Sequence, residues 1–280
     1  MSGTLYLCAT PIGNMEDITY RVVRILNEVD LIAAEDTRTS KKLLDRYNIN
    51  TRVTSYHEHN KIEKAKTLIN KLHDGNNIAL ITDAGTPGIS DPGEELVAMC
   101  YDENIEVTSL PGAAALVTAI TMSGQSSRRF VFEAFLPKDK KYRRHVLEEL
   151  KNETRTIIVY ESPHHLKSTL KELESVLGKD RELTITRELT KRHEEKNKTT
   201  FEKALEYYEE NEPRGEYVLV IAGKSKAMQE EEKREMWEET TIKEHMDIYL
   251  KQGLDKKEAM KAVAKDRGVS KRDIYKELID

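Results

Sequence analysis

Short β-branched runs alternate along the first 223 residues with runs whose apolar side chains recur at helical spacing. This alternation predicts strand–helix–strand units in mostly parallel sheets, and therefore an α/β fold. In the first half, the expected strands are Leu5–Ala9, Leu31–Ala34, Ile78–Thr82 and Ile105–Leu110. In the second half, they are Phe130–Phe135, Thr156–Glu161, Leu183–Arg187 and Tyr217–Ala222. A helix is expected from Asn60 to Asp74, because its apolar residues follow the helical period and Gly75 provides a stop.

Small and polar residues at 122–125 separate the two series of strands. We therefore expect an N-terminal α/β domain over residues 1–122 and a C-terminal α/β domain over residues 123–225. The remaining residues, 226–280, have no strand-like run and predict a charged linker followed by a small helical extension of three helices.

The end of this extension resembles a helix-turn-helix. A turn at residues 268–270 precedes Lys271–Tyr275, with Ser270 as the expected N-cap and two cations at the start of the helix. A small helical bundle without nucleic-acid contact is the alternative, since surface helices commonly carry Lys and Arg.

The composition bounds the class of protein. With 280 residues, 38% hydrophobic and 34% charged, the chain can bury more than one core. No apolar run approaches the roughly 18 residues of a membrane span, and no signal peptide is recognisable, so a soluble, cytoplasmic protein without a membrane partner is expected. Cys8 and Cys100 lie far apart in apolar stretches, which predicts buried reduced thiols rather than a disulfide or a metal site.

The net charge of −5 counts against a nucleic-acid partner, because binding by counterion release requires clustered cations. An average can hide a local patch, however. Lys138–Arg144 is basic, and Arg128 and Arg129 lie nearby in sequence. This segment predicts either an RNA-binding patch or a merely solvated helical face.

Three loops rich in glycine, proline and alanine directly follow predicted strands: Ala9–Asn14, Thr82–Gly93 and Leu110–Ala115. Ligands of open parallel sheets bind outside the carboxyl ends of the strands, and small residues let a ligand approach the backbone. Plain tight turns are the alternative for any one loop, but three together predict one shared pocket. No Gly-x-Gly-x-x-Gly follows the first strand and no Gly-x-x-x-x-Gly-Lys-Ser/Thr is present, so a pyrophosphate ligand lacks support.

Specific motifs identify a family that the sequence resembles. They are Ala9–Asn14, Glu35–Arg38, His57–Asn60, Asp83–Gly93, Leu110–Ala115, Tyr160–His164, Arg187–Lys191 and Gly215–Tyr217. Together they resemble the RsmI family, the small-subunit ribosomal RNA 2′-O-methyltransferases of the tetrapyrrole-methylase superfamily. The likeness spans residues 4–223, with a looser match in the helical extension. At Lys196–Thr199 the sequence departs from the family, whose members often have a glycine-containing turn there.

The resemblance implies two α/β domains of the tetrapyrrole-methylase type, S-adenosyl-L-methionine bound in the cleft between them, and a homodimer. It also implies methylation of the ribose of a cytidine in the decoding region of 16S rRNA within the small ribosomal subunit. From the N-terminal domain, the implied donor-binding residues are Pro11, Asp83, Ala84, Gly85, Ile89, Ser90, Ala113 and Ala114. From the C-terminal domain, they are Phe135, Leu136, Tyr160, Glu161, Glu188, Leu189, Gly215 and Glu216. For Asp83, a turn or helix cap is the alternative.

Methyl transfer to a hydroxyl requires in-line alignment and an acceptor for the hydroxyl proton. The candidate catalytic residues are Glu35, Asp36 and His57, with Glu58 and His59 beside them, and capping or ion pairing is the alternative for each. The candidate RNA-binding residues are Arg38, Lys138, Lys141, Arg143 and Arg144. For Arg38, an intramolecular carboxylate partner is the alternative.

Two other functions remain open at this point. One is a methyltransferase of the same superfamily that acts on a tetrapyrrole or on a modified amino acid of a protein. The other is a non-catalytic ribosome-binding protein that uses the pocket to sense a nucleoside.

Overall fold

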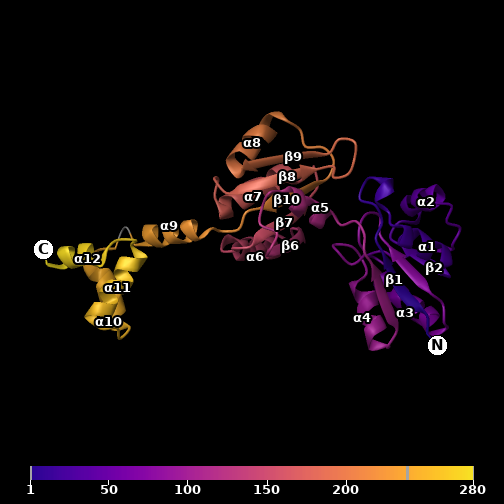
Figure 1. Ribbon diagram of the computed structural model, residues 1–280, viewed down its shortest axis with the longest axis horizontal. Helices are drawn as coiled ribbons and strands as arrows, with labels where there is room; N and C mark the ends of the chain where they lie inside the picture. The colour runs from indigo at the N-terminus through magenta and orange to yellow at the C-terminus, as the bar shows by residue number, and fades with distance from the viewer. Residues whose placement is uncertain (1, 238–239, 280) are drawn as a thin grey trace. The chain divides into compact units, whose positions relative to one another are not determined.

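The computed structural model describes residues 2–237 and 240–279 (Figure 1). Residues up to Lys151 together with Arg155–Ala222 form one compact unit, and Asn152–Thr154 with the chain from Gly223 onward form another. The first unit contains two five-stranded sheets. Within the described ranges, no helix is both long and apolar enough to cross a membrane.

The first sheet is wholly parallel, with the strand order β3-β2-β4-β1-β5. Its strands are β1 (Thr4–Cys8), β2 (Leu31–Ala34), β3 (Val53–Ser55), β4 (Ile78–Ile81) and β5 (Glu106–Leu110). The four strands expected from the sequence are confirmed, with ends that differ by at most one residue. Strand β3 is not among the expected strands, because a half-buried edge strand of three residues has too short a pattern to stand out.

Alternate residues of these strands enter two separate cores. Leu5, Ala33 and Leu80 face α3 (Lys61–His73) and α4 (Glu94–Asp102), which confirms the helix expected at 60–74. The opposite face packs against α1 (Tyr20–Glu28) and α2 (Thr37–Arg46). A short 3-10 helix, η1 (Met15–Asp17), precedes α1, and α5 (Ala115–Met122) follows the sheet. A parallel sheet covered on both faces explains why its strands read as continuous apolar runs.

Both cysteines are fully buried in these cores, one on each side of the sheet. Burial raises the pKa of the Cys8 thiol to about 12 and that of Cys100 to about 11. The expectation of buried reduced thiols is confirmed, because both sulfurs are free and stay protonated at neutral pH.

The second sheet has the strand order β6-β7-β10-β8-β9 and is mixed. Its strands are β6 (Phe130–Phe135), β7 (Thr156–Glu161), β8 (Glu182–Arg187), β9 (Glu195–Thr200) and β10 (Tyr217–Ile221). Among these described strands, only β6 and β7 are parallel, so the expectation of mostly parallel sheets is wrong for this half. The reason is the short loop between β8 and β9, which holds no crossover helix and therefore returns the chain antiparallel.

The segment Lys196–Thr199, where the sequence departs from the family pattern, lies in strand β9. All four of its residues pair with β8 in an unbroken register. Helices α6 (Lys140–Lys151), α7 (Leu166–Leu177) and α8 (Phe201–Glu210) pack their apolar residues on one face of this sheet. Leu116, Ala119 and Ile120 of α5 pack with Ile158, Val218 and Val220, which belong to the other face.

The second compact unit is helical. It contains α9 (Lys226–Met236), α10 (Ile242–Lys251), α11 (Lys256–Asp266) and α12 (Lys271–Ile279). The three expected helices correspond to α10–α12, whereas α9 lies in the segment expected to be a charged linker. Ser270 caps α12 as predicted, since its hydroxyl accepts the Asp273 N–H at 3.3 Å and donates to that carboxylate at 2.6 Å. The domain boundaries after residues 122 and 225 remain predictions.

Candidate active site

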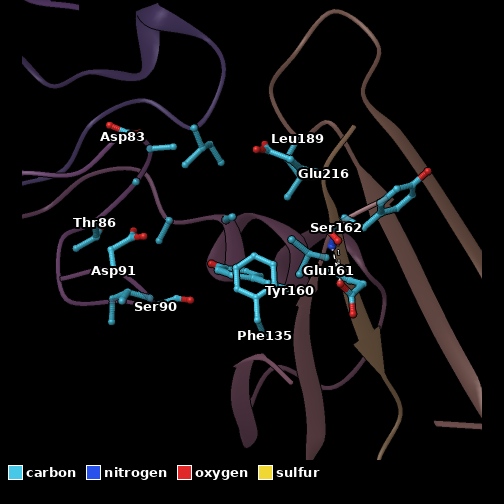
Figure 2. Close-up of a pocket in the computed structure, with 18 of the residues that line it drawn as sticks. Asp83, Thr86, Ser90, Asp91, Phe135, Tyr160, Glu161, Ser162, Leu189 and Glu216 are labelled. Atoms are coloured by element: carbon cyan, nitrogen blue, oxygen red, sulfur yellow. Dashed lines mark hydrogen bonds between the residues drawn. The ribbon is translucent and has the colours of Figure 1, made fainter. Parts of the chain in front are cut away.

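A cavity of about 460 Å³ lies where the strands of both sheets end (Figure 2). Its first wall comes from loops after four strands of the first sheet: Ile12, Glu35, Asp83, Ala84, Gly85, Thr86, Ile89, Ser90, Asp91, Ala114 and Ala115. Its second wall comes from the second sheet: Phe135, Tyr160, Glu161, Ser162, Pro163, Leu189, Glu216, Tyr217 and Val218. The volume lies in the range of small-molecule sites, roughly 300–1,000 Å³.

Most residues that the sequence singled out as donor-binding line this cavity. Those at its wall are Asp83, Ala84, Gly85, Ile89, Ser90, Ala114, Phe135, Tyr160, Glu161, Leu189 and Glu216. The other five, Pro11, Ala113, Leu136, Glu188 and Gly215, are sequence neighbours of lining residues. Thr86 and Asp91 were missed although they belong to the Thr82–Gly93 loop, because a sequence pattern does not say which side chains of a loop face inward.

The loops of the first wall are held together by close backbone contacts. Thr10 and Gly85 exchange two backbone hydrogen bonds, of 2.8 and 3.1 Å, which join the loops after β1 and β4. Gly85 has φ +88°, a left-handed conformation that favours glycine. A Cβ at Gly112 would lie 2.5 Å from the Ala9 Cβ, so the loop after β5 also needs a residue without a side chain. The three loops therefore form one wall, as the sequence predicted.

The second wall owes its shape to a bulge in β6. The pairing of β6 with β7 shifts between Phe132 and Phe135, and Ala134 has φ +49°. A bulge re-aims the following side chain, and Phe135 here faces the cavity beside Tyr160, with ring centroids 5.8 Å apart. The Tyr160 hydroxyl accepts the Leu116 N–H at 2.9 Å. This bond fixes an apolar platform against α5.

Three carboxyl groups, those of Glu35, Asp83 and Asp91, give the first wall an acidic character. Burial, and then the negative charges of Glu35 and Asp83, raise the pKa of Asp91 to about 7. Burial also raises the pKa of Glu35 and that of Asp83. Each carboxylate disfavours ionisation of the others, so a positively charged ligand in the cavity would relieve their repulsion.

The candidate catalytic residues occupy different places. Glu35 lines the cavity, and its carboxylate accepts the Asp83 N–H at 3.4 Å. Asp36 is the N-cap of α2 and pairs with Arg38 at 2.8 Å. The hydrogen bonds from Arg38 lower the pKa of Asp36 to about 2, so capping and ion pairing account for Asp36, whereas the Arg38 side chain remains 90% exposed.

The residues of the His57–Asn60 motif also make local structural contacts. His57 is bound to Asn60 through its backbone N–H, at 2.9 Å, and Glu58 pairs with Lys61 at 2.9 Å. Of the described residues at the cavity wall, none comes from the His57–Asn60 motif.

The cations of the basic segment Lys138–Arg144 have two different environments. The Arg143 guanidinium lies against α7, where it binds Glu172 at 2.6 Å and Thr169 at 2.8 Å. Lys138, Lys141 and Arg144 are exposed. Arg143 thus serves the packing of α6 on α7, while the other three cations face solvent.

A loop contact closes one side of the cavity. A Cβ at Gly13 would lie 2.7 Å from the Thr190 Oγ1 and 3.0 Å from the Leu189 carbonyl oxygen, and the Asn14 N–H donates to Thr190 Oγ1 at 3.0 Å. Thr190 has φ +64°, an uncommon conformation for a β-branched residue. Since Ile12 and Leu189 both line the cavity, this contact sets the distance between its two walls.

Comparisons with known proteins agree with this geometry. The profile of the tetrapyrrole (corrin/porphyrin) methylases matches residues 4–205. The ribosomal RNA small subunit methyltransferase I of Halalkalibacterium halodurans is 50% identical over 273 residues, which cover 98% of this chain and 93% of that protein. The protein of the same name from Bacillus subtilis is 47% identical, with coverages of 98% and 93%.

Two solved structures share the fold at low sequence identity. Diphthine synthase aligns with a TM-score of 0.61 and 13% identity, over 82% of this chain and 94% of that one. Cobalt precorrin-4 methyltransferase aligns with a TM-score of 0.57 and 17% identity, over 78% and 94%. These two likenesses show the tetrapyrrole-methylase fold.

The methyl donor of this family is S-adenosylmethionine. The cavity fits that molecule, because Phe135 and Tyr160 offer an apolar platform, small residues at 84–85 and 114–115 leave room, and the carboxyl groups complement a cationic sulfonium and amine. By its sequence over nearly its whole length and by its fold, the chain belongs to the tetrapyrrole methylase family and, within it, to the ribosomal RNA small subunit methyltransferase I group.

Proposed function

We propose that this methyltransferase acts on 16S rRNA in the small ribosomal subunit and methylates the 2′-hydroxyl of a cytidine in the decoding region. The observation that carries the proposal is the match with relatives named ribosomal RNA small subunit methyltransferase I over 98% of this chain. The likenesses to diphthine synthase and to a precorrin methyltransferase support the fold alone, since their identities are 13% and 17%.

The proposed donor site is the cavity, with the sixteen residues that the sequence analysis named at its wall or next to it. When bound, S-adenosylmethionine supplies a methyl group on a positively charged sulfur. The acidic wall would favour that charge, and the Phe135–Tyr160 platform would exclude water from the reacting atoms. Rigid loops on both walls would hold the partners in line, which is the main source of rate in such a displacement.

A transfer assay tests the function. Purified protein, S-adenosylmethionine with a tritiated methyl group and small subunits from cells that lack the modification are mixed, and the label is located by nuclease digestion and mass spectrometry. We expect label on the ribose of one cytidine of the 16S rRNA. Label on a ribosomal protein would overturn the proposal, and donor binding without any transfer would support the non-catalytic sensor.

We propose the exposed cations Lys138, Lys141 and Arg144, together with Arg38, as RNA contacts. For the triple charge reversal of Lys138, Lys141 and Arg144 to Glu, we expect the affinity for RNA to fall at least about tenfold at physiological salt. The slope of log affinity against log salt should also decrease, since each lost phosphate contact removes about 0.7–0.9 from it.

The matched control for this charge reversal is Lys151→Glu, at the exposed end of the same helix. Fluorescence anisotropy with small-subunit RNA at several salt concentrations measures both quantities. An unchanged slope would remove this segment from the proposed interface. Arg143 is left out, because its reversal would disrupt the contact of α6 with α7.

Gly13→Val is expected to weaken donor binding roughly tenfold, or about 1.4 kcal/mol. The new side chain would push against the Leu189 carbonyl and Thr190, and thus separate the two cavity walls. Isothermal titration with S-adenosylmethionine measures the effect. Thr190→Val, which removes the hydrogen bond from Asn14 but keeps the shape, should cause a smaller loss. If Gly13→Val binds S-adenosylmethionine as tightly as the wild-type protein, the contact between Gly13 and Thr190 does not set the distance between the cavity walls.

The homodimer implied by the family remains a prediction. Sedimentation equilibrium of the purified chain distinguishes a dimer from a monomer.

A further inference from the structure

The Asp91 carboxyl differs from the other acidic groups of the cavity. Within the described part of the chain, it has no hydrogen-bond or ion-pair partner, and burial and two negative charges alone perturb it. Glu35 accepts an N–H from Asp83, and Asp83 accepts one from Asp36. Glu161 accepts the Ser162 N–H at 2.7 Å and the Thr169 hydroxyl at 2.5 Å. A partly buried carboxyl without a partner is costly, and such groups gather at functional sites.

The loop holds this carboxyl in place. Ser90, directly before it, has φ +66°, a left-handed conformation in a residue that is not glycine. At the end of the loop, a Cβ at Gly93 would lie 3.1 Å from the Gly88 nitrogen and 3.2 Å from Leu80 Cδ2, so the turn is tightly closed. Strain of this kind persists where the surrounding structure fixes a functional conformation. Figure 2 shows the Asp91 carboxyl directed from this loop into the cavity, toward the side on which Tyr160 lies.

The geometry points to Asp91 as the catalytic residue that accepts the proton of the attacking hydroxyl, an inference that rests on the proposed methylation of a ribose 2′-hydroxyl. Glu35, Asp36 and His57 are the candidates for this role that the sequence predicts. Asp36 is held as an ion by Arg38, and His57 lies outside the wall formed by the described residues. Glu35 lines the cavity but accepts the Asp83 N–H. Among the described carboxyl groups at the cavity wall, Asp91 is the one with no hydrogen-bond or ion-pair partner on either oxygen.

The titration of Asp91 suits a base at neutral pH. Its pKa lies at about 7 because of burial and of the charges of Glu35 and Asp83, which belong to the loops after β2 and β4. Tyr160 faces it from β7, and the Asp91 charge in turn helps to raise the pKa of that phenol. A general base works best when its pKa is near the working pH. Above pH 7 the ionised, proton-accepting form dominates, and below pH 7 it is lost.

In the proposed step, the ribose oxygen forms a bond to the methyl carbon, and the carbon–sulfur bond breaks with its electron pair going to sulfur. The hydroxyl proton moves to an Asp91 oxygen and later leaves to water. The products are the 2′-O-methyl ribose, a neutral thioether and one proton, so charge and atoms balance.

The experiment compares Asp91→Asn with wild-type protein in single-turnover methyl transfer to small subunits, at saturating donor and RNA. We expect the variant's rate to be about 100- to 10,000-fold lower. Its dissociation constant for S-adenosylmethionine, measured by calorimetry, should rise far less than the rate falls, because Glu35 and Asp83 keep the wall acidic. The wild-type rate should fall tenfold per pH unit below the pKa of Asp91 in the donor complex, which the positive charge of the donor holds below the value of about 7 in the free protein, and the variant should lose this dependence. The control is Asp102→Asn, the same change at the exposed end of α4.

A readout without activity accompanies the assay. In wild-type protein labelled with 13C-aspartate, one carboxyl resonance should titrate near pH 7 and be absent in Asp91→Asn. Weaker donor binding with an unchanged saturated rate would overturn the inference and make Asp91 a donor ligand. If the variant does not fold, the wild-type titration decides, since an Asp91 resonance that titrates near pH 4 would also overturn it. Failure of the proposed function is distinct, because wild-type protein itself would then transfer no methyl group to RNA.

Discussion

Replacing Ala114 by tryptophan is expected to raise the dissociation constant for S-adenosylmethionine at least about 100-fold, which corresponds to about 2.8 kcal/mol. Ala114 lines the cavity, and its backbone is extended immediately before α5. An indole at this place would fill space in a cavity of about 460 Å³ that the donor needs. Calorimetry measures the binding, and the transfer assay should show a parallel loss of activity.

The control for this prediction is Val117→Trp, which introduces the same group one turn later in α5 at a position that is 51% exposed. Circular dichroism should show both variants folded, with wild-type donor binding in the control. Tight binding by Ala114→Trp would mean that the donor lies elsewhere, and the proposed donor site would then be wrong.

Leu219→Ala is expected to destabilise the second sheet by about 2–5 kcal/mol, the usual cost of emptying a buried leucine site. Leu219 lies in β10, which pairs with β7 on one side and β8 on the other, and its side chain is fully buried in the core below the sheet. The surrounding strands are held by hydrogen bonds and cannot collapse into the space.

Hydrogen exchange measures this loss locally, which suits a chain with more than one core. The free energy of exchange should fall by about 2–5 kcal/mol for the amides of β7, β8 and β10. The exchange rates of the amides in the first sheet should change little. The control is Leu250→Ala, at a position that is 40% exposed. It should lower the free energy of unfolding by much less than Leu219→Ala does. Equal effects of the two substitutions would contradict the assignment of Leu219 to the core.

The acidic wall of the cavity explains why the donor loops could be predicted but their chemistry could not. Glycine and proline after predicted strands indicate a ligand site by composition alone, and the parallel first sheet brings those loops together. The charge of each carboxyl depends on neighbours that are distant in sequence. The charge of Glu35 raises the pKa of Asp91, although Glu35 lies 56 residues earlier in the chain. No local sequence pattern includes both residues.

The same reasoning applies to the residues that sequence motifs made prominent. The Glu35–Arg38 motif suggested catalysis or RNA binding, yet Asp36 caps α2 and pairs with Arg38. Arg143 belongs to a basic run, but it binds Glu172 of α7. A motif marks residues that matter, whereas their partners decide whether they act on a substrate or on the fold.

The sequence by itself determined the eight main strands, the helical extension, the buried thiols and the family, because each depends on local periodicity or on a specific order of residues. Tertiary structure alone decided the antiparallel arrangement of β8, β9 and β10, the inward turn of Arg143 and the free carboxyl of Asp91. These features arise from contacts between segments far apart in the chain, and hydrogen bonding, burial and charge act through space rather than along the sequence.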